Sequence, residues 1–278
     1  MNLENILNKG SKILKSHNIQ TYDLDAQLLL ANILGIQREI LITKDRVKVT
    51  KKIIKKYDSV INRRIKKEPI AYIIGKKEFW SNDFLVNRAT LVPRPETELL
   101  IYKTVSFFKN KKINILDIGT GSGCILLSIL MELNLARGIG IDISSNAIKI
   151  AKMNCKKLNL LNRAKFKVSD LFNYNSGKYD LIVSNPPYIP LKDIKNLSRD
   201  ITNHEPMIAL NGGYDGLDQI KKVIYKSSYL LKNKGLLALE IGTGQYKKVS
   251  SILRNYRFRE IAKEYDNNRN VRCIMSTK

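Results

Sequence analysis

Histidine, cysteine and tryptophan are scarce in this sequence, with two, three and one in 278 residues. The cysteines, Cys124, Cys155 and Cys273, are far apart and lack the paired spacing of zinc ligands. With only His17 and His204 besides, we expect no metal site. The same pattern predicts three reduced thiols in a reducing compartment.

Long apolar runs are also missing. No run approaches the about 18 to 20 residues that cross a bilayer, and the amino terminus, MNLENILNKG, carries charges where a signal peptide needs an apolar stretch. We therefore expect a soluble, cytoplasmic protein. Hydrophobic residues make up 44% of the chain, which is enough to bury a substantial core in one large domain or two unequal ones.

Acidic residues are outnumbered, which gives a formal net charge of +24. Clustered Lys and Arg gain affinity for polyanions by releasing counterions. Here the basic residues are spread along the chain, and Lys, Ile and Asn are all abundant, as an AT-rich genome would enforce. Direct binding to nucleic acid is allowed but not required, and a functional basic face and a compositional bias both stay open.

The pattern of apolar residues divides the chain into three regions. Residues 1–75 show helical spacing and predict a small helical domain, with Thr50 capping a helix that runs to about Arg64. Aromatic and β-branched residues from Glu68 to Val92 predict a β-hairpin, so that 76–95 links the helical domain to a larger domain at 96–278.

In the larger region, short apolar strands alternate with amphipathic helices. INILDIG, GIGID, FKVSD and YDLIVS are the expected strands, with helices over 123–133 and 144–158 between them. Further helices over 217–231 and 243–254 precede two adjacent strands near 257–262 and 271–276. This alternation predicts an α/β fold with a doubly wound, mostly parallel sheet that ends in an appended hairpin.

A glycine-rich loop follows the first of these strands. It reads Asp117-Ile118-Gly119-Thr120-Gly121-Ser122-Gly123. Glycines let a backbone approach a ligand closely, and open α/β sheets bind ligands at the carboxyl ends of their strands. The dinucleotide pattern would require glycine at Cys124. Asp142 ends the second strand, where it would accept hydrogen bonds from ribose hydroxyls, while Asp117 would meet an ammonium group.

The third strand ends in Ser169-Asp170-Leu171. The glycine loop with Asp142 resembles that of class I S-adenosylmethionine-dependent methyltransferases, and in that family this segment lies over the adenine. The resemblance implies that Asp170 accepts a hydrogen bond from the adenine amine and that Leu171 packs on the ring. A helix cap at Asp170 with a core Leu171 explains the same residues equally well.

The fourth strand leads directly into Asn185-Pro186-Pro187-Tyr188. The prolines restrict the backbone, so the Asn185 side chain and the Pro186 carbonyl are presented rigidly as two acceptors for a planar –NH₂ group. Tyr188 would supply a flat face against it. Together with the glycine loop and Asp142, this motif resembles class I S-adenosylmethionine-dependent methyltransferases.

The sequence NPPY alone does not decide the substrate, since adenine-amino and glutamine methyltransferases share it. The flanking segments GKKEFWSNDFLVNRATLVPRPETELL, NHEPMIALNGGYDGLD and LLALEIG closely resemble peptide chain release factor glutamine methyltransferases. The resemblance covers essentially the whole chain. It implies transfer of a methyl group to the glutamine of the Gly-Gly-Gln motif in class 1 release factors, with the helical domain binding the factor and S-adenosylmethionine as co-substrate.

Some residues in these segments have two readings. Arg94, Glu96 and Glu98 would lie by the cofactor or form a helix start that follows Pro95. Leu171 stands where relatives often carry an aromatic ring, and His204 replaces an aromatic residue before Glu-Pro.

Two other functions remain as alternatives. The basic charge would suit a DNA or RNA adenine methyltransferase, although such enzymes usually add a domain for extruding a base. A non-catalytic module that binds RNA or the ribosome would need neither Asp142 nor NPPY.

Overall fold

The computed structural model describes residues 3–43 and 49–278. The chain forms two compact units. The helical unit comprises Met1–Lys76 together with Ser198–His204, and the sheet unit comprises Lys77–Leu197 and Glu205–Lys278. No described helix is long and apolar enough to cross a membrane. Within the described residues no group of histidine, cysteine or acidic side chains has the arrangement of a metal site.

The helical unit is built around an apolar core. Its elements are α1 (Leu3–Ser16), α2 (Tyr22–Leu34), α3 (Arg38–Thr43), α4 (Lys51–Ile65), α5 (Ile70–Ile74) and α9 (Arg199–Thr202). Thr50 caps α4 as predicted, since its hydroxyl accepts a hydrogen bond from the Ile53 amide at 3.3 Å. The Tyr57 side chain is buried and its hydroxyl donates to the Ala26 carbonyl, which joins α4 to α2.

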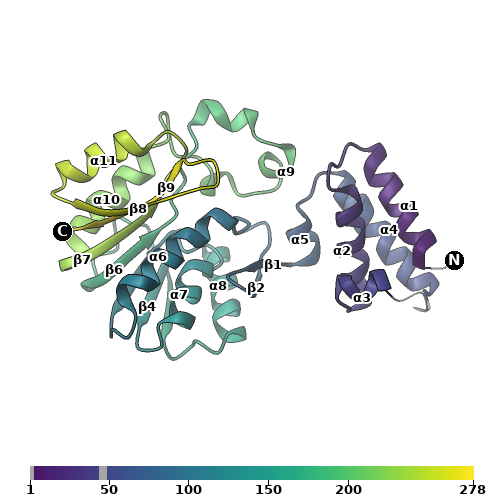
Figure 1. Cartoon of the computed structure of the whole chain (residues 1–278), viewed down its shortest axis with the longest axis horizontal. Helices are drawn as coiled ribbons and strands as arrows, with labels where there is room; N and C mark the ends of the chain where they lie inside the picture. Colours follow the sequence, from purple (N-terminus) through teal and green to yellow (C-terminus); the bar gives the residue numbers. More distant parts are fainter. Residues whose placement is uncertain (1–2, 44–48) are drawn as a thin grey trace. The chain divides into compact units, whose positions relative to one another are not determined.

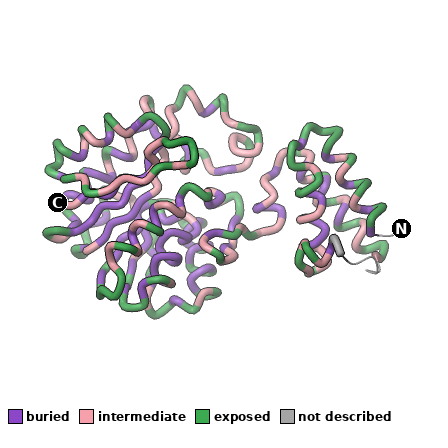
Figure 2. The backbone as a smooth tube through the Cα atoms, viewed as in Figure 1, coloured by how far each residue is buried: buried purple, intermediate pink, exposed green. Residues whose placement is uncertain are grey.

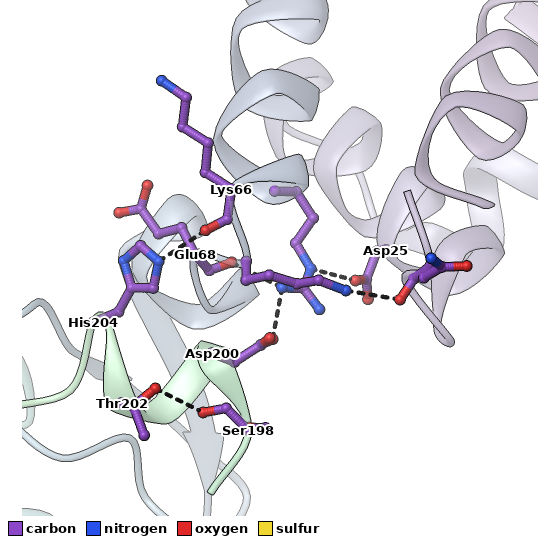
Figure 3. Close-up of polar contacts among 10 residues, drawn as sticks. Asp25, Lys66, Glu68, Ser198, Asp200, Thr202 and His204 are labelled. Carbon is purple, nitrogen blue, oxygen red and sulfur yellow. Dashed lines mark hydrogen bonds and ion pairs between the residues drawn. The ribbon is translucent and has the colours of Figure 1, made fainter. Parts of the chain in front are cut away.

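A buried charge cluster holds the segment Ser198–His204 within the helical unit (Figure 3). Arg64 donates from Nε to Asp25 at 2.6 Å and from Nη1 to Asp200 at 2.7 Å. The same Nη1 donates to the Glu68 carbonyl, and the His204 ring lies 3.1 Å from the Lys66 carbonyl. A short segment from late in the sequence is thus fixed by residues from the first quarter of the chain.

The sheet unit contains a seven-stranded sheet of order β5-β4-β3-β6-β7-β9-β8 (Figure 1). The strands are β3 (Asn114–Ile118), β4 (Arg137–Asp142), β5 (Ala164–Val168), β6 (Tyr179–Ser184), β7 (Leu231–Glu240), β8 (Arg259–Tyr265) and β9 (Val271–Thr277). The first five are parallel, and β9 pairs antiparallel with both β7 and β8. The predicted α/β class and the appended hairpin are confirmed.

Helices cover both faces of this sheet. Helices α6 (Glu98–Phe108), α7 (Cys124–Glu132) and α8 (Ser145–Lys157) pack on one face, and α10 (Asp218–Leu230) and α11 (Tyr246–Asn255) on the other. Successive strand residues alternate between the two cores, as Ile115 and Leu116 do, because side chains point to opposite faces of a strand. The central strands are buried on both sides (Figure 2).

The predicted β-hairpin is present but shorter than expected. Strands β1 (Lys76–Phe79) and β2 (Asn82–Leu85) are joined by Trp80 and Ser81, both at positive φ. Phe79 and Phe84 pack edge to face in the core beneath α6, α7 and α8. The expectation of β structure from Glu68 was wrong, because residues 70–74 form α5, whose apolar side chains pack in the helical core.

Candidate active site

A cavity of about 440 Å³ opens where parallel strands of the sheet unit end. Its wall includes residues that follow β3, β4, β5 and β6. The strand order reverses between β3 and β6, which is the position where open α/β sheets bind ligands. Lining residues that the sequence singled out are Ile118, Gly119, Thr120, Gly121, Asp142, Asp170, Leu171, Asn185, Pro186 and Pro187.

The glycine loop between β3 and α7 forms one wall of this cavity. Gly119 and Gly121 have φ values of +72° and +55°, a region that side chains disfavour, and a Cβ at either position would meet no other atom within 4 Å. The amides of Gly119 and Thr120 both donate to the Ile141 carbonyl at 2.9 Å, which fixes the loop to the end of β4. The loop therefore presents bare backbone to the cavity.

Asp117 lies beneath the loop rather than in the cavity wall. Its side chain is fully buried, and Oδ2 accepts a hydrogen bond from the Thr120 hydroxyl at 2.6 Å. Oδ1 is buried without a hydrogen-bond partner among the described residues. Burial raises the pKa of Asp117 to about 7. Its predicted contact with an ammonium group remains a prediction, and the unpaired oxygen is the atom that would make it.

Asp142 reaches the cavity from the end of β4. Oδ2 accepts from the Gly121 amide and Oδ1 from the Ser144 amide, each at 2.9 Å. Burial raises the pKa of Asp142, although these backbone hydrogen bonds favour the charged form. A carboxylate oxygen can accept more than one hydrogen bond, so the fixed carboxylate retains capacity to accept bonds from a diol.

Asp170 and Leu171 line the cavity after β5. Asp170 Oδ1 accepts a hydrogen bond from the Phe172 amide at 2.7 Å, which stabilises the turn, and Leu171 packs against the core beneath α10. The structure thus gives both residues structural contacts while leaving them in the wall.

The residues of the NPPY motif lie in two different environments. Asn185, Pro186 and Pro187 line the cavity directly after β6. Tyr188 is not among the lining residues described. Its hydroxyl accepts a hydrogen bond from Arg272 at 2.8 Å, and the Arg272 guanidinium lies 5.3 Å from the centre of its ring. A stacking role for Tyr188 against the substrate remains a prediction.

Two polar residues near Asn185, Thr97 and Glu240, were not predicted from the sequence to belong to the site. The Thr97 hydroxyl, at the end of the 3₁₀ helix η1 (Pro95–Thr97), accepts a hydrogen bond from Asn185 Nδ2 at 3.1 Å and donates to Glu240 Oε2 at 2.6 Å. Glu240 ends β7 and is fully buried. Burial raises its pKa to about 6. The signal was an acidic residue inside the apolar run LLALEIG.

The segment after NPPY returns to the cavity at Pro206, directly after the buried Glu205. The Glu205 carboxylate is buried and accepts from Arg94 Nη2 at 2.6 Å and from the Val92 amide at 3.2 Å. Arg94 and the neighbouring Pro206 both line the cavity. Glu98 has a different partner, since it accepts a hydrogen bond from the Trp80 amide and so supports the hairpin.

Comparison with solved structures defines the class of protein. A methyltransferase from Pyrococcus furiosus superposes with a TM-score of 0.55 at 16% sequence identity, over 78% of this chain and 98% of that one. A methyltransferase domain model matches residues 109–240. The seven-stranded sheet is that of the class I methyltransferase fold, and the sheet unit is therefore the catalytic unit of this protein.

Comparison of sequences identifies the family. The PrmC N-terminal domain model matches residues 5–75. The chain is 38% identical to the release factor glutamine methyltransferase of Clostridium acetobutylicum, over 100% of this chain and 99% of that protein. It is 42% identical to that of Buchnera aphidicola from Schizaphis graminum, over 93% and 92%. The chain belongs to the release factor glutamine methyltransferase family.

Proposed function

We propose that this enzyme transfers a methyl group from S-adenosylmethionine to the side-chain amide nitrogen of the glutamine in the Gly-Gly-Gln motif of class 1 peptide chain release factors. The observation that carries the proposal is the cavity itself, where Asn185 and Pro186 stand beside the glycine loop and Asp142. Family membership supports the choice of glutamine over adenine.

The residues of the cavity fit S-adenosylmethionine. Bare backbone at Gly119 and Gly121 leaves room for its amino acid moiety, and the buried Oδ1 of Asp117, which has no hydrogen-bond partner among the described residues, would accept a hydrogen bond from the ammonium group. Asp142 would hold the ribose hydroxyls, and Ile118, Asp170 and Leu171 would complete the wall around the nucleoside. The bound sulfonium supplies an electrophilic methyl carbon.

Asn185 and Pro186 would position the nucleophile. The Asn185 side-chain oxygen and the Pro186 carbonyl would each accept one hydrogen from the substrate –NH₂ group, and Pro187 would shape the wall beside it. In-line attack requires the nitrogen to lie roughly 3 to 3.5 Å from the methyl carbon. Positive charge grows on nitrogen during transfer, so both hydrogen bonds strengthen and stabilise the transition state more than the ground state.

This mechanism requires no strong base. The methylated amide cation is acidic enough to lose its proton to water. None of the described residues that line the cavity is a histidine, and the mechanism does not need one.

We further propose that residues 1–75 bind the release factor. The PrmC N-terminal domain model matches this region, and its residues form an apolar core of their own. Action on release factors would also locate the enzyme in the cytoplasm.

Transfer of labelled methyl from S-adenosylmethionine tests the proposal. The acceptors are a purified class 1 release factor, the same factor with its Gly-Gly-Gln glutamine changed to alanine, and duplex DNA. We expect label on the normal factor alone. Label on DNA alone would establish an adenine methyltransferase instead, and binding of S-adenosylmethionine with no transfer to any acceptor would indicate a non-catalytic module.

A further inference from the structure

We propose that Thr97 and Glu240 are positioning residues that fix the side-chain amide of Asn185 with its oxygen toward the substrate. The inference rests on the proposed function, in which Asn185 is the catalytic residue that accepts a hydrogen bond from the substrate amide. Asn185 Nδ2 donates to Thr97 Oγ1 at 3.1 Å, and Thr97 Oγ1 donates to Glu240 Oε2 at 2.6 Å.

The one hydrogen of the Thr97 hydroxyl decides the direction of the two hydrogen bonds that link Asn185, Thr97 and Glu240. A threonine hydroxyl has one hydrogen to donate, whereas an ionised carboxylate can only accept. The distance of 2.6 Å between Thr97 and Glu240 is typical of a hydroxyl bound to a carboxylate. Because its hydrogen is committed to Glu240, Thr97 can only accept from Asn185. The amide nitrogen therefore faces Thr97, and the oxygen is left for the cavity.

Glu240 is itself held in one orientation. Arg272 Nη2 lies 3.6 Å from its other oxygen, Oε1, and donates to the Tyr188 hydroxyl, which lies 3.4 Å from the same Oε1. Glu240 is fully buried and Thr97 is 2% exposed, so water does not compete for either group. Burial raises the pKa of Glu240 to about 6, while the Thr97 hydrogen bond and the Arg272 charge favour the ionised form, so Glu240 is a carboxylate at neutral pH.

The opposite orientation of Asn185 would oppose the reaction. An –NH₂ group facing the substrate –NH₂ group would place donor against donor, and it would repel the positive charge that develops during transfer. Rotation of the Asn185 amide by half a turn would therefore remove the stabilisation without changing the shape of the cavity. The positioning network makes this rotation unfavourable.

The first test compares Thr97→Val, which removes the hydroxyl and keeps the shape, with Thr97→Ser, which keeps the hydroxyl. Thr104→Val is the matched control, because Thr104 is a buried threonine on α6 whose hydroxyl has no partner among the described residues. With a release factor as acceptor, we expect Thr97→Val to lower kcat about 10- to 100-fold, somewhat less than deletion of a group that itself contacts the transition state. Thr97→Ser should stay within about threefold of the wild type, and the KM for S-adenosylmethionine should change little in all three variants.

The second test is Glu240→Gln, which reverses the direction of the hydrogen bonds between residue 240, Thr97 and Asn185. Arg272 would attract the glutamine oxygen, so the new –NH₂ group would donate to Thr97 and the Thr97 hydrogen would turn to the Asn185 oxygen. We expect a loss in kcat similar to that of Thr97→Val. Protonation of Glu240 would act in the same direction, so wild-type kcat should fall as pH drops through about 6, and this fall should be absent in Glu240→Gln.

Other ionisable groups lie near Glu240, and titration of any of them would also change kcat with pH. They are Arg272 and Cys273 on β9, Tyr188 after β6, Glu96 on η1 and Cys124 on α7. Burial raises the pKa of Cys124 to about 12 and that of Tyr188 to about 12, so neither titrates near pH 6. Glu96→Gln measures the contribution of the Glu96 carboxyl group, and the acid fall should persist in it. Burial raises the pKa of Asp117 to about 7, and because Asp117 is assigned to cofactor binding, kcat is compared at saturating S-adenosylmethionine.

The outcomes separate this inference from the proposed function. The positioning role would be overturned if Thr97→Val were as active as Thr104→Val. It would also be overturned if Glu240→Gln were as active as the wild type and its kcat still fell as pH drops through about 6. If Thr97→Val fails to fold, as judged by thermal melting and cofactor binding, Glu240→Gln alone decides. Absence of wild-type transfer to the release factor would instead reject the proposed function, and the positioning role with it.

Discussion

Arg64 in the helical unit and Glu240 in the catalytic unit are both buried charges with partners of opposite sign, yet their surroundings differ. Arg64 donates to two carboxylates, Asp25 and Asp200. Burial alone would lower the pKa of Arg64, but these partners raise it instead. Among residues 3–43 and 49–278, Glu240 pairs with one guanidinium, that of Arg272 at 3.6 Å, and burial raises the pKa of Glu240 to about 6. The first cluster is electrostatically satisfied, and the second is not.

The difference is the one expected between a structural cluster and the positioning network proposed for Glu240. A satisfied buried ion pair holds segments together, and its loss is a loss of stability. A buried carboxyl group whose pKa is shifted toward neutrality, next to a ligand cavity, is typical of an active site. Perturbing the Arg64 cluster should therefore change folding, and perturbing residues around the cavity should change catalysis or ligand binding.

The largest expected effect is on stability. Replacing Arg64 with methionine would leave Asp25 buried without its cation, and removing one partner of a buried pair costs about 3 to 5 kcal/mol. Urea unfolding followed by circular dichroism measures this loss, and hydrogen exchange should increase at residues 198–204. Unfolding at the wild-type midpoint with unchanged exchange would contradict the role given to the cluster.

The next effect is purely catalytic. Asn185→Ala should lower kcat for release factor methylation by about 100- to 1000-fold, because it deletes one group that stabilises the transition state. Cofactor affinity, measured by isothermal titration calorimetry, should stay within a few-fold of the wild type. Equal losses in transfer and in cofactor affinity would show that Asn185 acts mainly on binding.

Asp142→Ala should weaken cofactor binding more than turnover. Hydrogen bonds to a charged group contribute about 1.5 to 3 kcal/mol, which corresponds to a rise of about tenfold or more in the cofactor dissociation constant. The same calorimetric titration checks this value, and kcat at saturating cofactor provides the contrast with Asn185→Ala. An unchanged dissociation constant would remove Asp142 from the ribose site.

The smallest effect should come from an exposed ion pair. Lys9 and Asp58 lie 3.1 Å apart in the helical unit, with 47% and 43% of their side chains exposed. Such pairs typically contribute about 0 to 1 kcal/mol. Lys9→Ala is thus a control for Arg64→Met, and a comparable destabilisation in the two variants would mean that burial is not what distinguishes the Arg64 cluster.

The sequence predicted most of the fold, because the relevant signals are local. Alternating strands and helices from 113 onward, the Thr50 cap and the terminal pair of strands all appear as expected. The short helix α5 was missed, since the β-branched and aromatic residues of IAYII favour a strand and their packing in the helical core overrides that preference. The helix α3 was likewise too short to show a period.

The site could be predicted only where its residues follow strands. The glycine loop, Asp142 and NPPY were recognisable because each ends a strand of a parallel sheet, and such ends converge. Thr97 and Glu240 are 143 positions apart and meet only because η1 lies beside the end of β7. Pairing of Asp200 with Arg64, 136 positions earlier, was equally invisible, since neither residue belongs to a local pattern.

The grouping of residues 198–204 with the helical unit has a consequence for protein engineering and for evolution. A terminal module can usually be removed or exchanged by cutting the chain once. Here seven residues, 198–204, belong to the helical unit although residues of the catalytic unit flank them in the sequence, and Asp200 pairs with Arg64. Exchange of the first 76 residues between relatives would therefore have to carry this short segment with it, so the two parts of the enzyme are constrained to diverge together.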